Sequence, residues 1–219
     1  MAEVKRTYYE NGQLKSECFE INGKKNGEYK KYHSNGQLYE IYNCIDDNKN
    51  GEYKSYLLNG QLHQNDFYID GKKNGEAKTY DHNGRLWIIC SYIDGKIHGE
   101  FKLYYENGQL ESERFEIDGK INGEYKKYYE DGQLDEICSY IDDKINGEYK
   151  SYWNNGQLRT ICSCIDGKMH GEFKSYWDNG QLNEICCYID NKGNGEYKKY
   201  NENGELIEKY YYDNGIKVE

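Results

Sequence analysis

One turn recurs through the whole chain at a constant interval of 24 residues, with no insertion or deletion. Its glycines are Gly12, Gly36, Gly60, Gly84, Gly108, Gly132, Gly156, Gly180 and Gly204. The residue four before the glycine is always Tyr, and the residue two after it is always Leu. Self-similarity at one fixed period is typical of repeat arrays. We therefore predict one domain over residues 1–219, built from nine similar units, and we number each repeat so that this glycine is position 12.

Each repeat contains two segments with the composition of β-strands. Positions 3–8, as in residues 27–32, and positions 13–21, as in residues 133–141, are rich in aromatic and β-branched residues and are bounded by Gly, Asn and Asp. Nine such hairpins predict an all-β fold, an elongated single-layer antiparallel β-meander that twists or curls into a trough. The ninth repeat carries Asp213 where the other eight have Ile and Lys209 where five of them have Ile, which is typical of a capping repeat.

The turn at position 12 is expected to be a three-residue loop, Glu-Asn-Gly, with Gly as a bulge. The pairs expected across it in the second repeat are Tyr32–Leu38, Lys30–Glu40 and Tyr29–Ile41. A two-residue Asn-Gly loop would instead place Lys30 opposite Ile41. Across the other turn of the repeat, the same alternation predicts that Ile21 pairs with Tyr29 around a loop of about five residues.

This register assigns the recurring residues to two faces of the sheet. One face is expected to carry the positions of Tyr29, Ile41 and Ile45. The opposite face is expected to carry Tyr32 and Leu38, the columns of Glu and Lys at positions 4 and 6, and the cysteines. The adjacent Glu and Lys columns favour a ladder of exposed ion pairs over an anion-binding stripe, because their fields cancel.

The composition excludes several classes of protein. The net charge of -10 argues against nucleic acid and against an anionic membrane surface as partners, since both attract basic proteins. The chain has no apolar run of about 18 residues and enters the repeat at once, so we expect neither a transmembrane helix nor a secretory signal. The chain contains 26 Tyr, whose rings supply the apolar area that its few aliphatic residues do not.

The eight cysteines favour free thiols over disulfides or a metal site. Five of them share position 18, namely Cys18, Cys90, Cys138, Cys162 and Cys186. Cysteines at one position in successive repeats would be about 9–10 Å apart, which is too far for a disulfide. Two thiolates come together only at Cys162 with Cys164 and at Cys186 with Cys187, and no fourfold metal site is apparent. We therefore expect a reducing, cytoplasmic location.

We predict neither catalytic residues nor a cofactor. None of the five histidines recurs beside a nucleophile or carboxylate in a triad-like relation, and there is no phosphate-binding loop. Acidic residues are plentiful, but they belong to turns and to the charge ladder. The chain is therefore predicted not to be an enzyme.

Position 9 changes along the chain in a way that suggests a binding site. It is His33, Leu57 and Asp81 in early repeats and then an aromatic residue in four consecutive repeats. The candidate partner-binding residues are these four and one residue expected on the same face one strand across, namely Tyr105, Tyr129, Trp153, Trp177 and Trp87. The rings either cover the sheet near the turn or form an exposed aromatic strip that anchors a partner.

The recurring motifs resemble the MORN repeat in its variant form. The matching elements are Tyr-x-x-Asn-Gly-x-Leu in eight of the nine repeats, with Asp131 in place of Asn in the other, and Gly-Lys-x-His-Gly-Glu at residues 95–100 and 167–172. The resemblance covers essentially the whole chain and implies one β-hairpin per repeat, an extended curved sheet, and roles in protein binding, scaffolding or membrane association. Some bacterial members are described as toxin–antitoxin or immunity components. The acidity of this chain disfavours the lipid-binding role.

These observations lead to one functional hypothesis and two alternatives. We expect a non-enzymatic repeat scaffold that binds a protein partner. The first alternative is an antitoxin-like or immunity inhibitor with a single partner, and the second is a membrane-tethering module. The open strand edges at both ends of the sheet would also allow homodimers to form.

Overall fold

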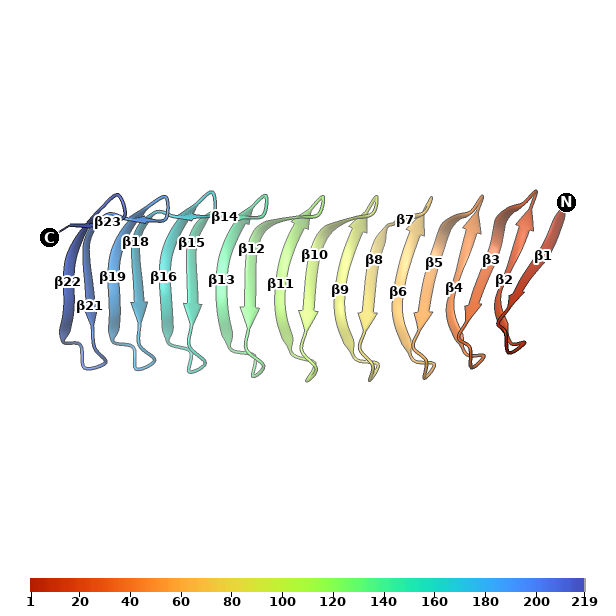
Figure 1. Cartoon of the computed structure of the whole chain (residues 1–219), viewed down its shortest axis with the longest axis horizontal. Coiled ribbons are helices and arrows are strands. Elements are labelled where there is room, and N and C mark those ends of the chain that lie inside the picture. Colours follow the sequence, from red (N-terminus) through yellow and green to blue (C-terminus); the bar gives the residue numbers. More distant parts are fainter. Residues whose placement is uncertain (219) are drawn as a thin grey trace. The chain divides into compact units, whose positions relative to one another are not determined.

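The structure is a computed structural model that describes residues 1–218. All regular elements among these residues are β-strands, and strands that follow one another in the chain pair antiparallel. The predicted all-β meander of hairpin repeats is confirmed (Figure 1). Residues 1–218 contain no helix that is long and apolar enough to span a membrane.

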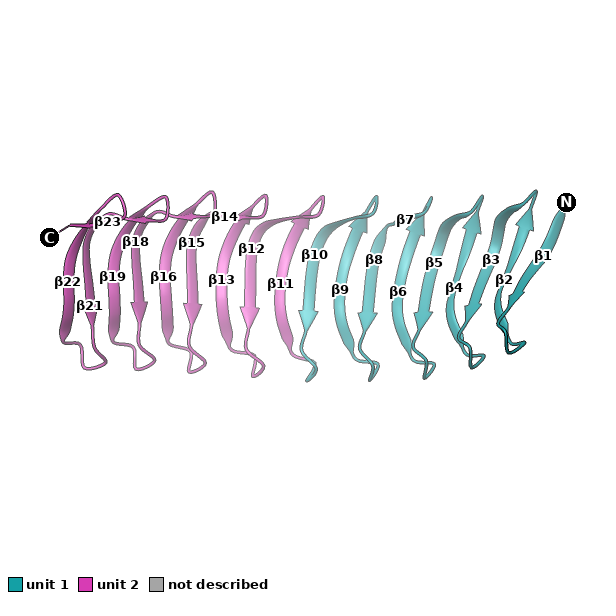
Figure 2. Ribbon diagram, in the orientation of Figure 1, with its two compact units in different colours: residues 1–108 teal, residues 109–219 magenta. Residues whose placement is uncertain are grey.

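The chain forms two compact units, Met1–Gly108 and Gln109–Glu219, and the strands of each lie side by side in one layer (Figure 2). Unit 1 contains β1 (Ala2–Tyr8), β2 (Leu14–Ile21), β3 (Lys24–Tyr32), β4 (Leu38–Ile45), β5 (Asn48–Tyr56), β6 (Leu62–Ile69), β7 (Lys72–Lys73), β8 (Gly75–Tyr80), β9 (Leu86–Ile93) and β10 (Lys96–Tyr104). Unit 2 contains β11 (Leu110–Ile117), β12 (Lys120–Tyr128), β13 (Leu134–Ile141), β14 (Lys144–Ile145), β15 (Gly147–Tyr152), β16 (Leu158–Ile165), β17 (Lys168–Met169), β18 (Gly171–Tyr176), β19 (Leu182–Ile189), β20 (Lys192–Gly193), β21 (Gly195–Tyr200), β22 (Leu206–Asp213) and β23 (Ile216–Val218).

Several repeats have a strand that is divided near its start, which separates the short strands β7, β14, β17 and β20 from the longer strands that follow them. The residue at the break donates its backbone N–H to a carbonyl of the preceding strand, as Asn74 does to Phe67 at 2.8 Å. The glycine at position 3 has a positive φ in these repeats, for example +104° at Gly147. Glycine adopts this conformation without the penalty that a Cβ brings, so the backbone can form a bulge there.

The turn at position 12 has the predicted form. The backbone N–H of Tyr129 donates to Gln133 O at 2.8 Å, and that of Gly132 donates to Tyr129 O at 2.9 Å. Gly132 has a φ of +85°, as a glycine bulge requires. The three-residue loop is therefore confirmed, and so is the pair Tyr32–Leu38 that follows from it.

A second bulge directly after this turn makes the other two predicted pairs wrong. The register shifts at Tyr39, so that Lys31 pairs with Glu40, Lys30 with Ile41, and Tyr29 with Tyr42. Lys30 therefore does not face Glu40, and Tyr29 does not face Ile41. One extra residue in the returning strand moves every later side chain to the opposite face, because the side-chain period of a strand is two.

The other turn of the repeat is shorter than expected. Ile21 pairs with Lys24, not with Tyr29, around the two residues Asn22 and Gly23. Both turn residues have positive φ, 54° and 80°, which is the conformation of a tight two-residue hairpin turn. The other residues of the expected loop between Ile21 and Tyr29 lie instead in the strand and in the bulge around position 3.

The second bulge also redistributes side chains between the two faces. Positions 1, 5, 7, 16, 18 and 20 form one face, which we call the cysteine face, and positions 4, 6, 8, 14, 17, 19 and 21 form the other, the ladder face. The predicted grouping is wrong in two respects. Tyr29 shares the cysteine face with Cys44, and Ile41 and Ile45 share the ladder face with Glu28 and Lys30.

The side chains that are buried in the described chain all lie on the cysteine face, so this face serves as the core of a one-layer sheet. They are Cys18, Glu20, Cys44, Tyr53, Ser55, Asp66, Ala77, Cys90, Ser112, Glu116, Cys138, Ser151, Cys162, Cys164 and Cys186. Tyr rings lie beside the cysteines, and Tyr29 and Tyr42 stack with their centroids 4.7 Å apart. Burial on one face only is what an isolated sheet can achieve by crowding its side chains.

Candidate protein-binding surfaces

The ladder face carries ion pairs that run along each strand instead of across strands. Glu52 and Lys54, two residues apart on β5, form an ion pair of 2.8 Å, and Glu100 and Lys102 on β10 form one of 2.9 Å. The hydrogen bond from Lys54 to Glu52 raises the pKa of the ammonium, so the lysine stays charged. Exposed pairs of this kind contribute little to stability, but they cancel charge locally. The paired Glu and Lys columns of this face are therefore neutral at short range.

A row of isoleucines at position 21 runs along the ladder face beside these pairs, and we call it the isoleucine stripe. Its side chains are 41–56% exposed. In unit 1 the stripe contains Ile21, Ile45, Ile69 and Ile93, and in unit 2 it contains Ile117, Ile141, Ile165 and Ile189. Three phenylalanines at position 19 of the same face, Phe19, Phe67 and Phe115, are 39–45% exposed. Each isoleucine lies opposite a polar residue across its turn, as Ile69 lies opposite Lys72, so the stripe is a row of separate apolar groups. Exposed apolar residues rimmed by polar ones mark interaction sites.

The isoleucine stripe could not be recognised from the sequence, because the expected register placed Ile45 on the face of Tyr29, away from the Glu and Lys columns. The alternation of residues along the strand shows the correct face of each isoleucine only when the bulge at position 15 is known. The residue at that position varies from Lys15 to Trp87 and Asp135, so no recurring residue type identifies the bulge.

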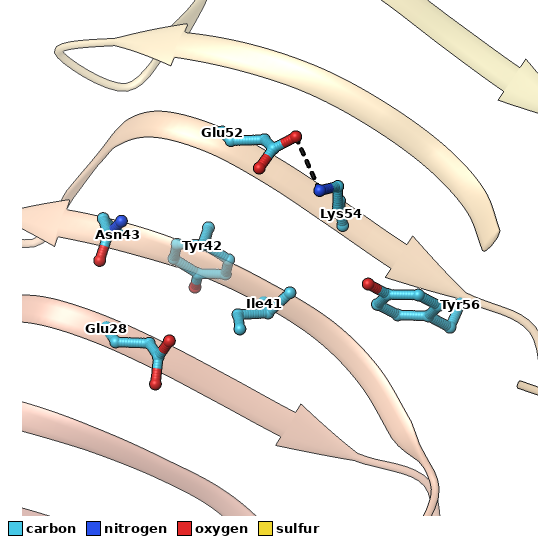
Figure 3. A pocket seen from close by; sticks show the side chains of 7 residues that line it. All are labelled: Glu28, Ile41, Tyr42, Asn43, Glu52, Lys54 and Tyr56. Carbon is cyan, nitrogen blue, oxygen red and sulfur yellow. Dashed lines mark ion pairs between the residues drawn. The ribbon is translucent and has the colours of Figure 1, made fainter.

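The ladder face also has shallow depressions between neighbouring strands. One in unit 1 has a volume of about 260 Å³, and Figure 3 shows its floor on β4 between the side chains of β3 and β5. Its lining residues are Glu28, Ile41, Tyr42, Asn43, Glu52, Lys54 and Tyr56. A similar depression of about 280 Å³ lies in unit 2 around Ile137 and Lys150. Sites for small molecules are usually deeper and mainly apolar, so these depressions are better suited to side chains of a protein partner.

The aromatic residues at position 9 hold neighbouring repeats together. Nε1–H of Trp153 donates to Tyr176 O at 3.0 Å, and Nε1–H of Trp177 donates to Tyr200 O at 3.2 Å. Tyr129 donates its hydroxyl to Tyr152 O at 2.6 Å in the same way. Each bond reaches the carbonyl 23 residues ahead, in the next repeat, and this relation was missed because it exists only between stacked hairpins.

The structure thus gives the five predicted binding residues different environments. Tyr129, Trp153 and Trp177 occupy equivalent places in successive repeats of unit 2, and all three are half-buried. Tyr105 holds the same position in unit 1 and is also half-buried. Trp87 lies one strand across in unit 1 and is 46% exposed. Of the three tryptophans, Trp87 therefore presents most of its side chain to solvent.

The cysteines are free thiols that differ in exposure. Seven of the eight are buried on the cysteine face, whereas Cys187 is exposed. Burial raises the pKa of Cys138 and that of Cys162 to about 12, with Glu136 and Cys164 respectively adding to the effect. Within residues 1–218, no three His, Cys, Asp or Glu side chains are grouped so that they could hold a metal ion.

Comparison with known proteins gives one match over nearly the whole chain, to the model of the MORN repeat variant. The matched residues are 4–19, 25–43, 49–70, 73–94, 97–115, 121–142, 145–163, 169–190 and 194–215. No curated protein matches the chain.

Solved structures show only a distant likeness. The TcdB2–TccC3–Cdc42 structure is 13% identical with a TM-score of 0.24, and the match covers 96% of this chain and 13% of that one. The Tc holotoxin pore of Photorhabdus luminescens is 14% identical with a TM-score of 0.23 and the same coverage. A porin-like protein from Bacteroides uniformis is 11% identical with a TM-score of 0.21, and the match covers 99% of this chain and 92% of that one. The chain spans only 13% of the length of the first two, and TM-scores this low carry no information about function.

Proposed function

Because the chain belongs to the MORN repeat variant family and is a repeat scaffold, we propose that it binds a protein partner without catalysing a reaction. The observation that carries this proposal is the isoleucine stripe on the ladder face. It presents half-exposed apolar side chains at intervals of two strands, about 10 Å, beside charges that are already paired. A neutral surface with an apolar row suits a protein partner better than a polyanion.

The ninth repeat supports a role for the stripe beyond folding. Asp213 holds position 21 there, and the hairpin still closes, with Asp213 paired to Ile216. Isoleucine at this position is therefore not required by the turn. Its presence in eight repeats is better explained by a contact that all eight make outside the chain.

The aromatic residues are proposed as a secondary contact. The indole N–H groups of Trp153 and Trp177 are engaged by the next repeat, so only their ring faces are available to a partner. Trp87, at 46% exposure, is the member of the group that is best placed to contact a partner directly.

The experiment compares capture of proteins from the native cell by three forms of the tagged chain. The stripe variant carries Ile45→Ser, Ile69→Ser and Ile93→Ser. Its matched control carries Leu58→Ser and Ile207→Ser, which remove apolar side chains of 60% and 57% exposure away from the stripe. We expect a stoichiometric partner that is lost by the stripe variant and kept by the control, and that rebinds the wild-type chain when both are purified.

Other outcomes decide between the alternatives. Capture that the stripe variant keeps but Trp87→Ala loses would move the contact to the aromatic residues. One tight partner would favour the antitoxin-like or immunity inhibitor, whereas several partners would favour a general scaffold. Binding to anionic vesicles without any protein partner would contradict the proposal and support membrane tethering.

A further inference from the structure

Repeat position 1, on the cysteine face, holds a lysine in three consecutive repeats of unit 1 and an apolar residue in the corresponding repeats of unit 2. The lysines are Lys25, Lys49 and Lys73, and their counterparts in unit 2 are Ile121, Ile145 and Met169. The hairpin closes in the same register with either type of residue, since Lys49 pairs with Cys44 and Met169 pairs with Cys164. The fold therefore does not require an ammonium group at this position.

Lys49 extends over a group of tyrosine rings. Its Nζ lies 4.6 Å from the centroid of Tyr42, 4.0 Å from that of Tyr53 and 5.1 Å from that of Tyr68. Among residues 1–218, Lys49 Nζ forms no ion pair or hydrogen bond, and burial lowers the pKa of the amine. Facing rings stabilise a cation but do not satisfy its N–H donors. A half-buried ammonium with unused donors is therefore available to an anion.

The carboxylates near Lys49 are engaged by other groups. Glu40 Oε2 accepts a hydrogen bond from Tyr53 at 3.1 Å. Asp66 forms an ion pair of 2.8 Å with Lys73, and its side chain is almost fully buried. Glu40 and Asp66 thus each have another partner, and although both act electrostatically on the Lys49 ammonium, neither forms an ion pair with it.

Lys25 has the same arrangement one repeat earlier in unit 1. Its Nζ lies 4.6 Å from the centroid of Tyr29, and the described residues give it no carboxylate partner. Tyr29 stacks on Tyr42, so the rings form a continuous surface from Lys25 to Lys49. Lysines of the ladder face differ in this respect, because Lys30 and Lys54 each pair with a glutamate of their own strand.

We propose that Lys25 and Lys49, with the tyrosine rings between them, bind an extended acidic segment of a protein partner. The two lysines stand two strands apart, about 10 Å, which is close to the rise of one three-residue turn of a polyproline II helix. A segment in this extended conformation presents every third side chain on one side, so a carboxylate at every third residue matches this spacing. Its intervening side chains would pack on the rings of Tyr29, Tyr42 and Tyr53, as aromatic contacts do in binding hot spots. This site lies on the opposite face from the isoleucine stripe.

The test measures binding of a fluorescein-labelled peptide, in which Glu recurs at every third residue between threonines, to the full chain by fluorescence anisotropy. The variant Lys25→Ile/Lys49→Ile imports the residue that later repeats use, so folding should be kept. The matched control, Lys30→Ile/Lys54→Ile, makes the same charge change on the ladder face. We expect the first variant to lose about tenfold in affinity and the control to lose less than about threefold.

Two further measurements keep the proposal open to refutation. Lys25→Gln/Lys49→Gln repeats the experiment without added apolar area, and the isoleucine-stripe variant should bind the peptide as the wild type does. The proposal is overturned if the wild type binds a peptide with Gln in place of Glu equally well. It is also overturned if the Lys25→Ile/Lys49→Ile variant and the Lys30→Ile/Lys54→Ile control lose the same affinity for the acidic peptide. Binding of anionic vesicles through Lys25 and Lys49, without binding of the peptide, would also overturn it.

Discussion

Repeat position 1 is Lys in three repeats of unit 1 and apolar in the corresponding repeats of unit 2, although its backbone surroundings are the same; the apolar type already appears at Ile97 in unit 1. In unit 1, Lys73 pairs with Tyr68, and in unit 2, Ile145 pairs with Tyr140 at the equivalent place. The hairpin accepts a charged or an apolar side chain there, because the backbone bonds and the turn decide the register. The array thereby supplies its own control, since the later repeats show which features of the earlier ones folding does not need.

The lysines of unit 1 are nevertheless not equivalent to one another. Lys73 forms an ion pair with Asp66, which is only 3% exposed, whereas Lys49 has rings around it and no carboxylate partner in the described chain. In the repeats of unit 2 that precede Ile145 and Met169, the position of Asp66 is held by the thiols Cys138 and Cys162. The comparison therefore separates a lysine that balances a buried charge from lysines that are available for binding.

Among substitutions at position 1, Lys73→Ile should have the largest effect on stability. It imports the residue of unit 2, but it leaves the Asp66 carboxylate buried without a counter-charge. We expect a loss of about 3–5 kcal/mol in the free energy of unfolding, compared with about 1 kcal/mol or less for Lys49→Ile. Urea denaturation, together with hydrogen exchange in β6 and β8, would measure the difference.

The double variant Lys73→Ile/Asp66→Cys supplies the control, because it reproduces the pair of residues that unit 2 uses. Its stability should return to within about 1.5 kcal/mol of the wild type. A Lys73→Ile variant that is no less stable than Lys49→Ile would show that the buried carboxylate does not depend on Lys73.

The thiols of the two units should differ in their pH dependence. Burial raises the pKa of Cys138 and Cys162 to about 12, and it also raises that of Cys44, but there Lys25 and Lys49 act in the opposite direction. We expect alkylation to modify Cys44 faster than Cys138. Their exposures, 3% and 2%, are nearly equal, so the comparison reports charge and not access.

The raised pKa values of the buried thiols also predict how stability depends on pH. A thiol whose pKa is raised in the folded state keeps its proton there, so the stabilisation is complete below the ordinary value of 9.0 and is lost as the pH rises towards about 12. Unit 2 should therefore lose stability in this range. Mass spectrometry of alkylated peptides at pH 8 and pH 10 would measure the alkylation rates, with the exposed Cys187 as the fast reference, and urea denaturation at the same pH values would measure the stability. Equal rates for Cys44 and Cys138 would contradict the role assigned to Lys25 and Lys49.

The period, the hairpins and the turn at Gly132 could be predicted from sequence because each depends on residues that are close in the chain. The bulge at Tyr39 could not, since its position is held by residues as different as His63, Trp87 and Arg159. That single residue decides which face every later side chain occupies. The error therefore exchanged the two faces for the isoleucines and the cysteines while leaving the fold class correct.

The candidate sites were harder to predict for a related reason. Tyr42, Tyr53 and Tyr68, which surround Lys49, come from β4, β5 and β6, so their meeting depends on the correct register of two turns. The bond from Trp153 to Tyr176 joins residues of successive repeats, and nothing near Trp153 in sequence predicts it. Aromatic residues at a recurring position indicated an important edge, but not that they hold the repeats together.

Hydrogen exchange at the indole N–H groups would sharpen the difference between the tryptophans of the two units. Trp153 and Trp177 of unit 2 donate to backbone carbonyls, whereas the indole N–H of Trp87 in unit 1 has no acceptor in the part of the chain that the structure describes. We expect slow exchange for the first two and fast exchange for Trp87. Trp153→Phe should lower stability by about 1 kcal/mol, because Tyr176 loses a hydrogen-bond donor. Trp87→Phe, as the control, should change stability by less than about 0.5 kcal/mol.

The smallest expected effect tests whether the difference at position 1 reaches the backbone. Asp47 in unit 1 and Asp143 in unit 2 both have positive φ, 71° and 67°. Each accepts the backbone N–H of position 1 of its own repeat, from Lys25 at 2.9 Å and from Ile121 at 2.7 Å. Substitution by Gly relieves the backbone strain and removes this bond, so the two effects should cancel to within about 0.5 kcal/mol, whereas Ala should cost about 1–2 kcal/mol.

Asp47→Gly and Asp143→Gly should behave alike in thermal denaturation, because the accepted N–H is the same whether the side chain beside it is Lys or Ile. A difference of more than about 1 kcal/mol between them would show that the lysines of unit 1 also change the backbone around them.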